Sequence, residues 1–478
     1  MHIKPYSCYI FSERTYIYAT YWGVGHHAKN TEHNDDSKKN DYFYKMTHIT
    51  QQLELELFPD EIKVEQDYTA TFADNMKLPI HKWYRYTAGF SASWVNDLIR
   101  QEQRNGRKRV IDPFAGSGTV LIESEFAGME SYGVESHPYI YRIAKAKLNW
   151  NYPPDKFKVE ALALLKVAKS KVITKTEYPK LIMKCYPMET IQKLEALKQA
   201  WLEKEQEDEI KNFNWFIITS ILRTTSPVGT AQWQYIQPNK TKSNVVDPYV
   251  AFEQKVHDMY NDMKRTQNRY KNVVESIILN EDARNIESIP QGWGDLVITS
   301  PPYANNYDYA DATRLEMTFW GDIAGWADLQ DNVRKHLVRA CTQHVSKLGA
   351  SIDSILSNPK LAVIQSELFE VYETLKEERL KHGGKKNYHL MIAAYFNDLA
   401  DVFHSLRKVT SENSKMCFVI GDSAPYGIYV PVDKWLGELA ISAGFSDYSF
   451  EKLRDRNIKW KNRKHTVPLH EGRLWINS

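Results

Sequence analysis

The hydrophobic pattern alternates between short apolar runs and longer stretches with helical spacing, and it predicts an α/β fold. Residues 109–112 lead into a glycine-rich turn, a helical pattern follows at 120–128, and a second apolar run begins at 131. Strand, loop, helix and strand in this order open a doubly wound sheet. The same rhythm resumes at 276–286 and 294–303, and it ends with a helix at 388–409, a strand at 415–423, a helix at 432–445, and strands near 448–454 and 470–477.

Two long stretches interrupt this rhythm. Residues 155–275 exceed the usual length of a strand–helix connection and show helical patterns around one irregular piece, 224–244. Residues 311–385 are also mainly helical. We therefore divide the chain into a flexible arm at 1–46, the first part of the sheet domain at 47–154, a helical insertion at 155–275, the sheet again at 276–310, a second insertion at 311–385 and the last part of the sheet domain at 386–478.

Composition narrows the cellular setting. The 478 residues carry 62 basic and 60 acidic side chains, so a face that binds nucleic acid would have to be local. The four cysteines are scattered without a CxxC pair, which favours a reducing cytoplasm and gives no reason to expect a metal. No apolar run approaches the roughly 20 residues of a membrane span, and the N-terminus lacks a signal-peptide layout. We expect a cytoplasmic protein without a membrane partner, with Met46 as a second candidate start.

A glycine-rich turn follows the first strand in the sequence DPFAGSGT. Gly116 and Gly118 allow the backbone to turn tightly and to approach a ligand, and N–H groups at the start of the next helix can face an anion. The turn is not a P-loop, because no GK[ST] follows, and Leu121 stands where the dinucleotide fingerprint needs a third glycine. Alone it is weak evidence for a site, since many such loops are only turns.

Two acidic residues follow the next strands along the chain. Glu135 ends the second strand, where a carboxylate is the usual partner of two vicinal ribose hydroxyls. Asp282 follows the third strand and could accept a hydrogen bond from an adenine amino group. Either residue could instead be a solvated loop side chain. Together with the glycine turn, they favour a site for an adenosine ligand that has no polyphosphate.

Four short motifs together resemble a known family. DPFAGSGT, GVES, NEDAR and TSPPY are similar to the successive motifs of the S-adenosylmethionine-dependent amino-methyltransferases, which make N4-methylcytosine or N6-methyladenine in DNA. The segment IHKWYRYTAGFS is similar to the one that covers the methionine end of the cofactor in that family. The resemblance covers residues 80–150, 275–310 and 385–478, and it covers neither insertion.

The resemblance implies a Rossmann-like, seven-stranded methyltransferase sheet with two mainly helical insertions, and it implies S-adenosyl-L-methionine as cofactor. The cofactor-binding residues that it implies are Tyr86, Ser91, Asp112, Phe114, Ala115, Gly116, Ser117, Gly118, Thr119, Glu135, Ser136, Asp282 and Ala283. The implied partner is double-stranded DNA, and a restriction–modification or phage-defence setting would add a cognate nuclease.

The TSPPY corner supplies the groups that methylation of an amine needs. An exocyclic amine of cytosine or adenine is a poor nucleophile, because its lone pair is delocalised into the ring, and acceptors on its two N–H bonds favour the tetrahedral form. The side chain of Ser300 and the carbonyl of Pro301 are the expected acceptors, and Pro301 and Pro302 make the backbone rigid. Tyr303 offers a face on which a flipped base can stack. These four are the candidate catalytic residues.

The residues of the corner indicate which atom of the target base is methylated. Methylation at carbon 5 of a pyrimidine needs a cysteine nucleophile, and none of the four cysteines lies near the corner in the sequence. In the resembling family, serine at the first corner position is more usual for N4-cytosine enzymes, and aspartate or asparagine for N6-adenine enzymes. We expect cytosine N4 as the target and keep adenine N6 as the alternative.

The region that reads the DNA sequence is less clear. The insertion between the second and third strand tips matches neither of the family arrangements that share this motif order. The best candidate is 223–243, which mixes cations, amides and aromatics suited to phosphates and base edges, although a plain surface loop fits nearly as well. The basic run at 454–465 is either a further candidate or a solvated face. The expected DNA contacts are Arg223, Gln232, Trp233, Gln234, Tyr235, Lys240, Asn305 and Tyr307.

Two other functions stay open. RNA amino-methyltransferases with a similar glycine turn typically carry an N-terminal RNA-binding module and DPPY or NPPY, and neither is visible here. A non-catalytic subunit that only recognises nucleic acid would be expected to have degraded motifs, whereas those of this chain are intact.

Overall fold

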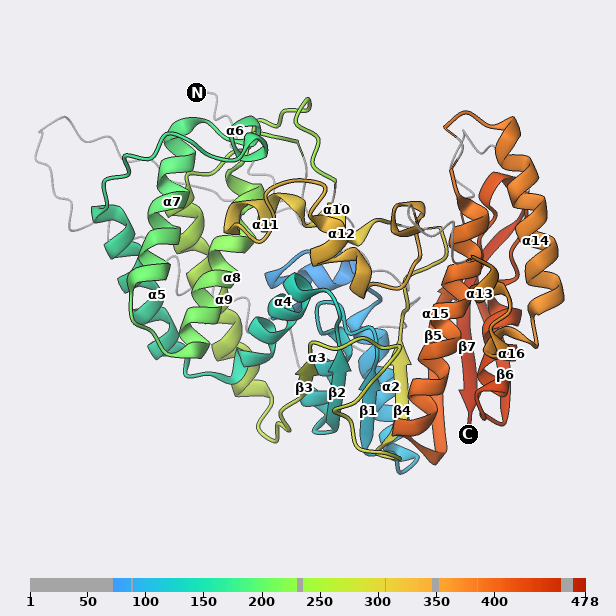
Figure 1. The fold of residues 1–478 in the computed structure, drawn as a ribbon. Coiled ribbons are helices and arrows are strands. Elements are labelled where there is room, and N and C mark those ends of the chain that lie inside the picture. The colour runs from blue at the N-terminus through green and yellow to red at the C-terminus, as the bar shows by residue number, and fades with distance from the viewer. Residues whose placement is uncertain are drawn as a thin grey trace, which may run out of the picture. The chain divides into compact units, whose positions relative to one another are not determined.

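A computed structural model describes residues 72–86, 89–229, 235–305, 307–345, 352–384, 386–456 and 467–478 (Figure 1). The chain divides into two units, Met1–Asp67 and Tyr68–Ser478, and all described residues belong to the second, which is compact. Among them, no helix has the length and apolar character that crossing a membrane requires. The predicted arm at 1–46 with Met46, most of the basic run at 454–465, and Gln232, Trp233 and Gln234 lie outside the described residues.

A seven-stranded sheet organises the second unit. Its order is β3-β2-β1-β4-β5-β7-β6. The strands β1 to β5 pair in parallel, and β7 pairs antiparallel with both β5 and β6. This confirms an α/β fold with a mostly parallel sheet. The strands span Arg109–Asp112 (β1), Glu130–Val134 (β2), Ile277–Leu279 (β3), Gly294–Thr299 (β4), Thr410–Gly421 (β5), Asp447–Arg456 (β6) and Leu469–Asn477 (β7).

Both faces of the sheet are covered, because its inner strands are apolar on both sides. Val110 of β1 packs in one apolar cluster with Val95 of α2 (Ala92–Arg104). The next residue of the strand, Ile111, packs in another cluster with α15 (Tyr388–Val409), which contacts β5 (Figure 1). Successive side chains of a strand point to opposite faces, so this change of cluster at each residue is expected of a parallel sheet buried on both sides. Helices α3 (Thr119–Ala127) and α16 (Val432–Ser442) also pack against strands.

The connection between β2 and β3 is a bundle of helices, drawn mainly in green in Figure 1. Its apolar core includes Phe157, Phe213 and Trp215. Residues 226–229 and 235–247 are irregular, and an isolated bridge pairs Val228 with Thr241. The helices are α4 (Pro138–Leu148), α5 (Pro154–Ser170), α6 (Lys180–Cys185), α7 (Met188–Glu203), α8 (Asp208–Thr225) and α9 (Pro248–Arg269).

The connection between β4 and β5 contacts both the bundle and the sheet. Its early part belongs to the core of the bundle through Leu315 and Phe319, and its later part packs on α15 through Leu368 and Leu375. Before α15 it contains α10 (Tyr309–Ala312), α11 (Arg314–Trp320), α12 (Leu329–Asn332), α13 (Ile352–Leu356) and α14 (Gln365–Glu378).

Arg223 ties the bundle to this second connection. Its guanidinium donates to both carboxylate oxygens of Glu316 on α11, at 2.7 and 3.0 Å, and to the carbonyl of Ala312 at 3.0 Å. The side chains of the ion pair are only 3% and 1% exposed. A DNA phosphate cannot reach Arg223 in this position, so we correct the expected DNA contact. The guanidinium instead holds α8 against α11, and removal of either partner would leave a buried charge without its counterion.

Candidate active site

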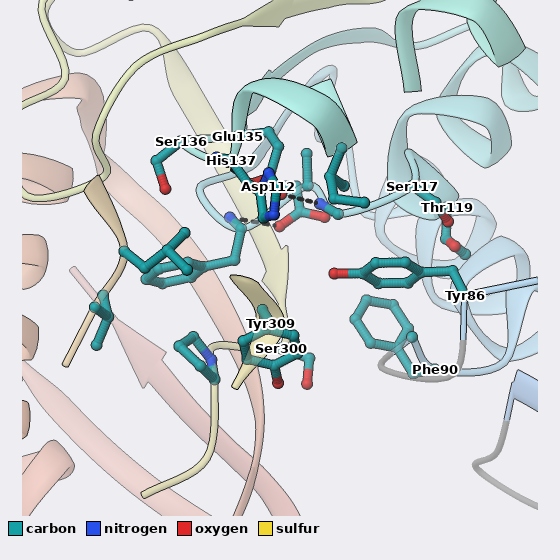
Figure 2. Close-up of a pocket in the computed structure, with 18 residues that line it drawn as sticks. Tyr86, Phe90, Asp112, Ser117, Thr119, Glu135, Ser136, His137, Ser300 and Tyr309 are labelled. Carbon is teal, nitrogen blue, oxygen red and sulfur yellow. Dashed lines mark hydrogen bonds between the residues drawn. The ribbon is translucent and has the colours of Figure 1, made fainter. Parts of the chain in front are cut away.

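A cavity of about 760 Å³ opens at the carboxyl ends of β1, β2 and β4 (Figure 2). Ligands of open α/β sheets bind at this edge. The glycine turn and the proline corner therefore face the same space. The predicted site residues that line the cavity are Tyr86, Asp112, Phe114, Ala115, Gly116, Ser117, Thr119, Glu135, Ser136, Ser300 and Pro302.

The glycine turn needs glycine at Gly116 for two reasons. The residue has a φ of +53°, in the left-handed region, and a Cβ there would lie 2.9 Å from Cε1 of Tyr86. The ring of Tyr86 therefore packs directly on the turn, beside the cavity (Figure 2). Gly118, with a φ of +84°, is the N-cap residue of α3 and does not line the cavity.

Asp112 joins the glycine turn to the proline corner. Its Oδ1 accepts hydrogen bonds from Oγ1 of Thr299 at 2.6 Å and from the N–H of Phe114 at 3.1 Å. Thr299 ends β4 and directly precedes Ser300. Burial raises the pKa of the Asp112 carboxyl to about 7. The hydrogen bonds of this carboxyl fix the position of the corner relative to the turn.

Glu135 directly follows β2, and two backbone donors hold its carboxylate. Oε2 accepts from the N–H of Gly116 at 2.9 Å, and Oε1 accepts from the N–H of His137 at 2.7 Å. A carboxylate has about four acceptor positions, so two are left for hydroxyl groups of a ligand. Burial raises the pKa of Glu135 to about 8, against the opposing effect of the two backbone hydrogen bonds.

The raised pKa of Glu135 predicts that binding of an adenosine ligand depends on pH. Ribose hydroxyls donate best to an ionised carboxylate, so a bound ligand favours the charged form. Below about pH 8 the free protein carries a proton on Glu135 that has to leave on binding. We expect the affinity for S-adenosylmethionine to rise about tenfold per pH unit from about pH 6 to pH 8 and then to level off. Calorimetric titration in buffers of different ionisation enthalpy measures both the affinity and the released proton.

The control for this prediction is Glu135→Gln, which cannot titrate. This variant should bind S-adenosylmethionine more weakly, with a nearly flat pH profile over the same range. A profile that keeps its slope in Glu135→Gln would contradict the assignment and would point to Asp112, whose pKa of about 7 lies in the same window.

Ser300 directly follows β4, and its hydroxyl group already donates a hydrogen bond within the protein. Oγ donates to the carbonyl of Val419 on β5 at 3.2 Å. A hydroxyl has one donor and two acceptor positions. The side chain of Tyr303 also hydrogen-bonds with Ser300, which still leaves one acceptor position on the oxygen. Ser300 can therefore accept a hydrogen bond from a group in the cavity.

Tyr303 belongs to the corner but does not line the cavity. The guanidinium of Arg456, at the end of β6, lies over its ring, 5.0 Å from the centroid. Burial raises the pKa of the Tyr303 hydroxyl above its ordinary value. A cation thus covers one face of the ring, and a stacked base would have to use the other face.

Four further predicted residues lie outside the cavity wall. The Ser91 side chain caps α2 by accepting from the N–H of Trp94 at 3.4 Å. Asp282 forms an ion pair with Arg284, with Nη2 and Oδ2 2.5 Å apart, and its expected adenine contact stays a prediction. Ala283 is buried in the apolar core, and Pro301 of the corner is buried and does not line the cavity.

Of the residues expected to contact DNA, Tyr235 and Tyr307 contact each other. Tyr235 of the bundle stacks on Tyr307, with ring centroids 4.3 Å apart and planes 13° apart. The hydroxyl of Tyr235 accepts from the N–H of Asp308 at 2.8 Å. These contacts hold the irregular piece of the bundle against the segment that follows the corner. Lys240 and Asn305 are exposed.

Several other residues that line the cavity were not predicted from the sequence. Gly89 and Phe90 lie within the segment IHKWYRYTAGFS, so the resemblance could have included them. Leu337 and Val338 come from the connection between β4 and β5, where no motif marks them. The full set is Gly89, Phe90, His137, Ile140, Tyr309, Leu337 and Val338.

Three type II methyltransferases are similar to this chain over most of its length. The identity is 25% over 443 residues to M.AvaI of Nostoc sp., 23% over 447 residues to M.BsoBI of Geobacillus stearothermophilus, and 22% over 426 residues to M.MvaI of Kocuria varians. These alignments cover 86%, 83% and 84% of this chain and 89%, 87% and 89% of the relatives. Such coverage cannot leave out the whole of 155–275, so the relatives share at least part of that segment. No protein-family model and no solved structure matches the chain.

Proposed function

We propose that this protein is a site-specific DNA methyltransferase of a restriction–modification system, which methylates the exocyclic amine of a flipped base with S-adenosylmethionine as donor. The observation that carries the proposal is that the turn at Gly116 and the corner at Ser300 line one cavity. The similarity to type II methyltransferases supports it, and so does the resemblance of four motifs to those of DNA amino-methyltransferases.

The cavity suits S-adenosylmethionine in the chemistry of its wall. The absence of a side chain at Gly116 lets the ring of Tyr86 pack against the turn beside the cavity. Two acceptor positions of Glu135 suit the ribose hydroxyls. The aromatic rings of Tyr86 and Phe90 suit a sulfonium cation. When bound, this cofactor supplies an electrophilic methyl group.

The corner would bind the target amine and activate it. The Ser300 oxygen, whose hydrogen is donated to Val419, accepts from one N–H of the amine. The carbonyl of Pro301 is the proposed acceptor for the other N–H, and the proline rings restrict the backbone there. Two acceptors favour the tetrahedral form of the nitrogen, so that its lone pair leaves conjugation with the base. The hydrogen bond between Thr299 and Asp112 holds these acceptors in place beside the glycine turn.

The target base would have to leave the duplex, because its amine is otherwise buried in the base pair. The face of Tyr303 that Arg456 does not cover would stack on the base, which is worth about 1–3 kcal/mol. We assign the irregular piece between α8 and α9 to DNA contact, because Tyr235 and Tyr307 hold it beside the corner segment. Exposed Lys240 is a candidate for a phosphate contact.

We propose cytosine N4 as the target, and adenine N6 is the alternative. The proposal rests on serine at position 300, which in the resembling family is more usual for cytosine enzymes. A hydroxyl oxygen can accept from either amine, so physical chemistry alone does not separate the two bases.

Sequencing of modified bases in DNA from cells that express the protein tests this proposal. We expect N4-methylcytosine at one short sequence word, at nearly every occurrence, and none in cells that carry the empty vector. N6-methyladenine at one word would keep the enzyme class and correct the base. Methylation of RNA without methylation of duplex DNA would overturn the proposed substrate, and no methylation of either would overturn the proposed activity.

A further inference from the structure

A short segment of the connection between β4 and β5 contributes to the cavity wall. Residues 334–340, here called the strap, begin with the short helical turn Arg334–His336. Leu337 and Val338 follow, line the cavity and are 8% and 5% exposed. The strap is remote in sequence from the glycine turn, so only tertiary structure brings it to the cavity.

A buried ion pair holds the first end of the strap. Nη2 of Arg334 lies 2.6 Å from Oδ2 of Asp308, and the two side chains are 3% and 2% exposed. Asp308 follows the proline corner, and its N–H donates to the hydroxyl of Tyr235. Nε2 of His344 lies 3.5 Å from the same carboxylate, and Nδ1 of His344 lies 3.1 Å from the carbonyl of Val338. Asp308 thus joins the strap, the corner segment and the bundle.

A second buried carboxylate, that of Asp398, holds the other end of the strap. Asp398 of α15 accepts from the N–H and Nε of Arg339, both at 2.9 Å, and from its Nη2 at 2.5 Å. Nη1 of Arg284 lies 3.3 Å from Asp398, and Nη2 of Arg284 donates to the carbonyl of Lys335 in the strap. Charge-assisted bonds to a buried carboxylate are strong and directional, so the backbone of the strap has little freedom at either end.

The strap shares an apolar cluster with a residue of the glycine turn. Val338 is in the apolar cluster against which Phe114 of the glycine turn packs. Phe114 precedes Gly116 by two residues, and the N–H of Gly116 is bonded to Glu135.

We propose that the strap is the adenine-binding wall of the cofactor site, with Leu337 and Val338 packing on the ring and with Arg334 and Arg339 as positioning residues. This inference rests on the proposed function and deepens it. Adenine is bonded directly to ribose and has two apolar faces, so a ribose held by Glu135 puts the ring next to the apolar groups nearby. Since Asp308 also follows the corner, the ion pair that positions the wall links the cofactor site to the proposed base site.

Val338→Trp tests the wall, because an indole would occupy the space proposed for adenine. We expect the Kd for S-adenosylmethionine and for S-adenosylhomocysteine to rise at least about tenfold. The affinity for duplex DNA and the melting temperature without cofactor should stay close to the original. The matched control is Val363→Trp, since Val363 lies in the same connection, is 52% exposed and does not line the cavity. It should leave all three measurements unchanged.

Arg339→Ala tests the positioning role. Asp398 keeps Arg284 as its counterion, so the variant should fold. We expect KM for the cofactor to rise about tenfold while kcat at saturating cofactor stays near the original, and Arg339→Lys to recover part of the loss. A purely structural role would instead lower the melting temperature without a selective change in KM.

The outcomes separate this inference from the proposed function. If the original protein binds S-adenosylmethionine and both Val338→Trp and Arg339→Ala bind it equally well, the strap inference fails and the proposed function stands. If the original protein binds no S-adenosylmethionine, both fail. If Val338→Trp does not fold, the KM of Arg339→Ala for the cofactor tests the strap inference alone. A rise in this KM supports the inference, and an unchanged KM contradicts it.

Discussion

Replacement of Ser300 with alanine is expected to lower kcat about 10²–10³-fold, the size of effect seen when one preorganised hydrogen-bonding group is removed from an active site. The Ser300 oxygen donates its hydrogen to Val419 and keeps an acceptor position for the target amine. Alanine removes that acceptor, so the lone pair of the amine stays delocalised in the base. Single-turnover methylation of a duplex that contains the recognised word measures the effect.

The affinity for the cofactor distinguishes this role from a general defect. Ser300→Ala should bind S-adenosylmethionine within about threefold of the original, since Glu135 and the glycine turn are unchanged. Ser300→Asn, which restores a side-chain acceptor, should keep more turnover than Ser300→Ala. The matched control is Ser136→Ala on the same cavity wall, which should change KM for the cofactor rather than kcat. Turnover by Ser300→Ala at the original rate would contradict the proposed role of the corner.

Replacement of Gly116 with valine is expected to weaken binding of S-adenosylmethionine at least about 100-fold, equivalent to about 2.7 kcal/mol. A Cβ at this position would lie 2.9 Å from the ring of Tyr86, so either the ring moves or the turn does. Movement of the turn also shifts the N–H that donates to Glu135. A β-branched side chain is further disfavoured at a φ of +53°. Calorimetric titration of the purified variant measures the loss.

Gly292→Val is the control that separates a local effect on the cavity from the general effect of backbone strain. Gly292 has a φ of +64°, and an added Cβ would meet nothing within 4 Å. The backbone strain that comes from a positive φ is therefore comparable at the two positions, but Gly292 lacks the clash with Tyr86 and does not line the cavity. We expect both variants to lower the melting temperature, Gly116→Val more than Gly292→Val, and only Gly116→Val to lose the cofactor. Equal cofactor affinity in both variants would contradict the proposed place of the ligand.

Much of the fold followed from local patterns. The apolar runs predicted the strands, because residues such as Val110 and Ile111 must both be buried when helices cover both faces of a sheet. The order of the last strands did not follow. The strand β7 lies between β5 and β6, which depends on pairing between segments that are distant in the chain. A local pattern carries no information about that choice of neighbour.

The candidate site divides in the same way. The glycine turn, Glu135 and Ser300 were found because each follows a strand, and the carboxyl ends of parallel strands meet at one edge of the sheet. Arg223 was assigned to DNA contact, yet its guanidinium is buried in an ion pair with Glu316. Residue type suggested a DNA contact for this charge, but the charge is paired with another residue of the same chain.

The sequence by itself determined that a glycine turn, an acidic residue and a serine–proline corner stand at strand ends, because backbone restrictions and strand periodicity act over a few neighbouring residues. Only the tertiary structure decided which of those side chains face the cavity and that the strap supplies Leu337 and Val338 to its wall. The physical reason is that burial and ion pairing depend on which distant segments meet. The two carboxylates that hold the strap, Asp308 and Asp398, come from different elements far apart in the chain.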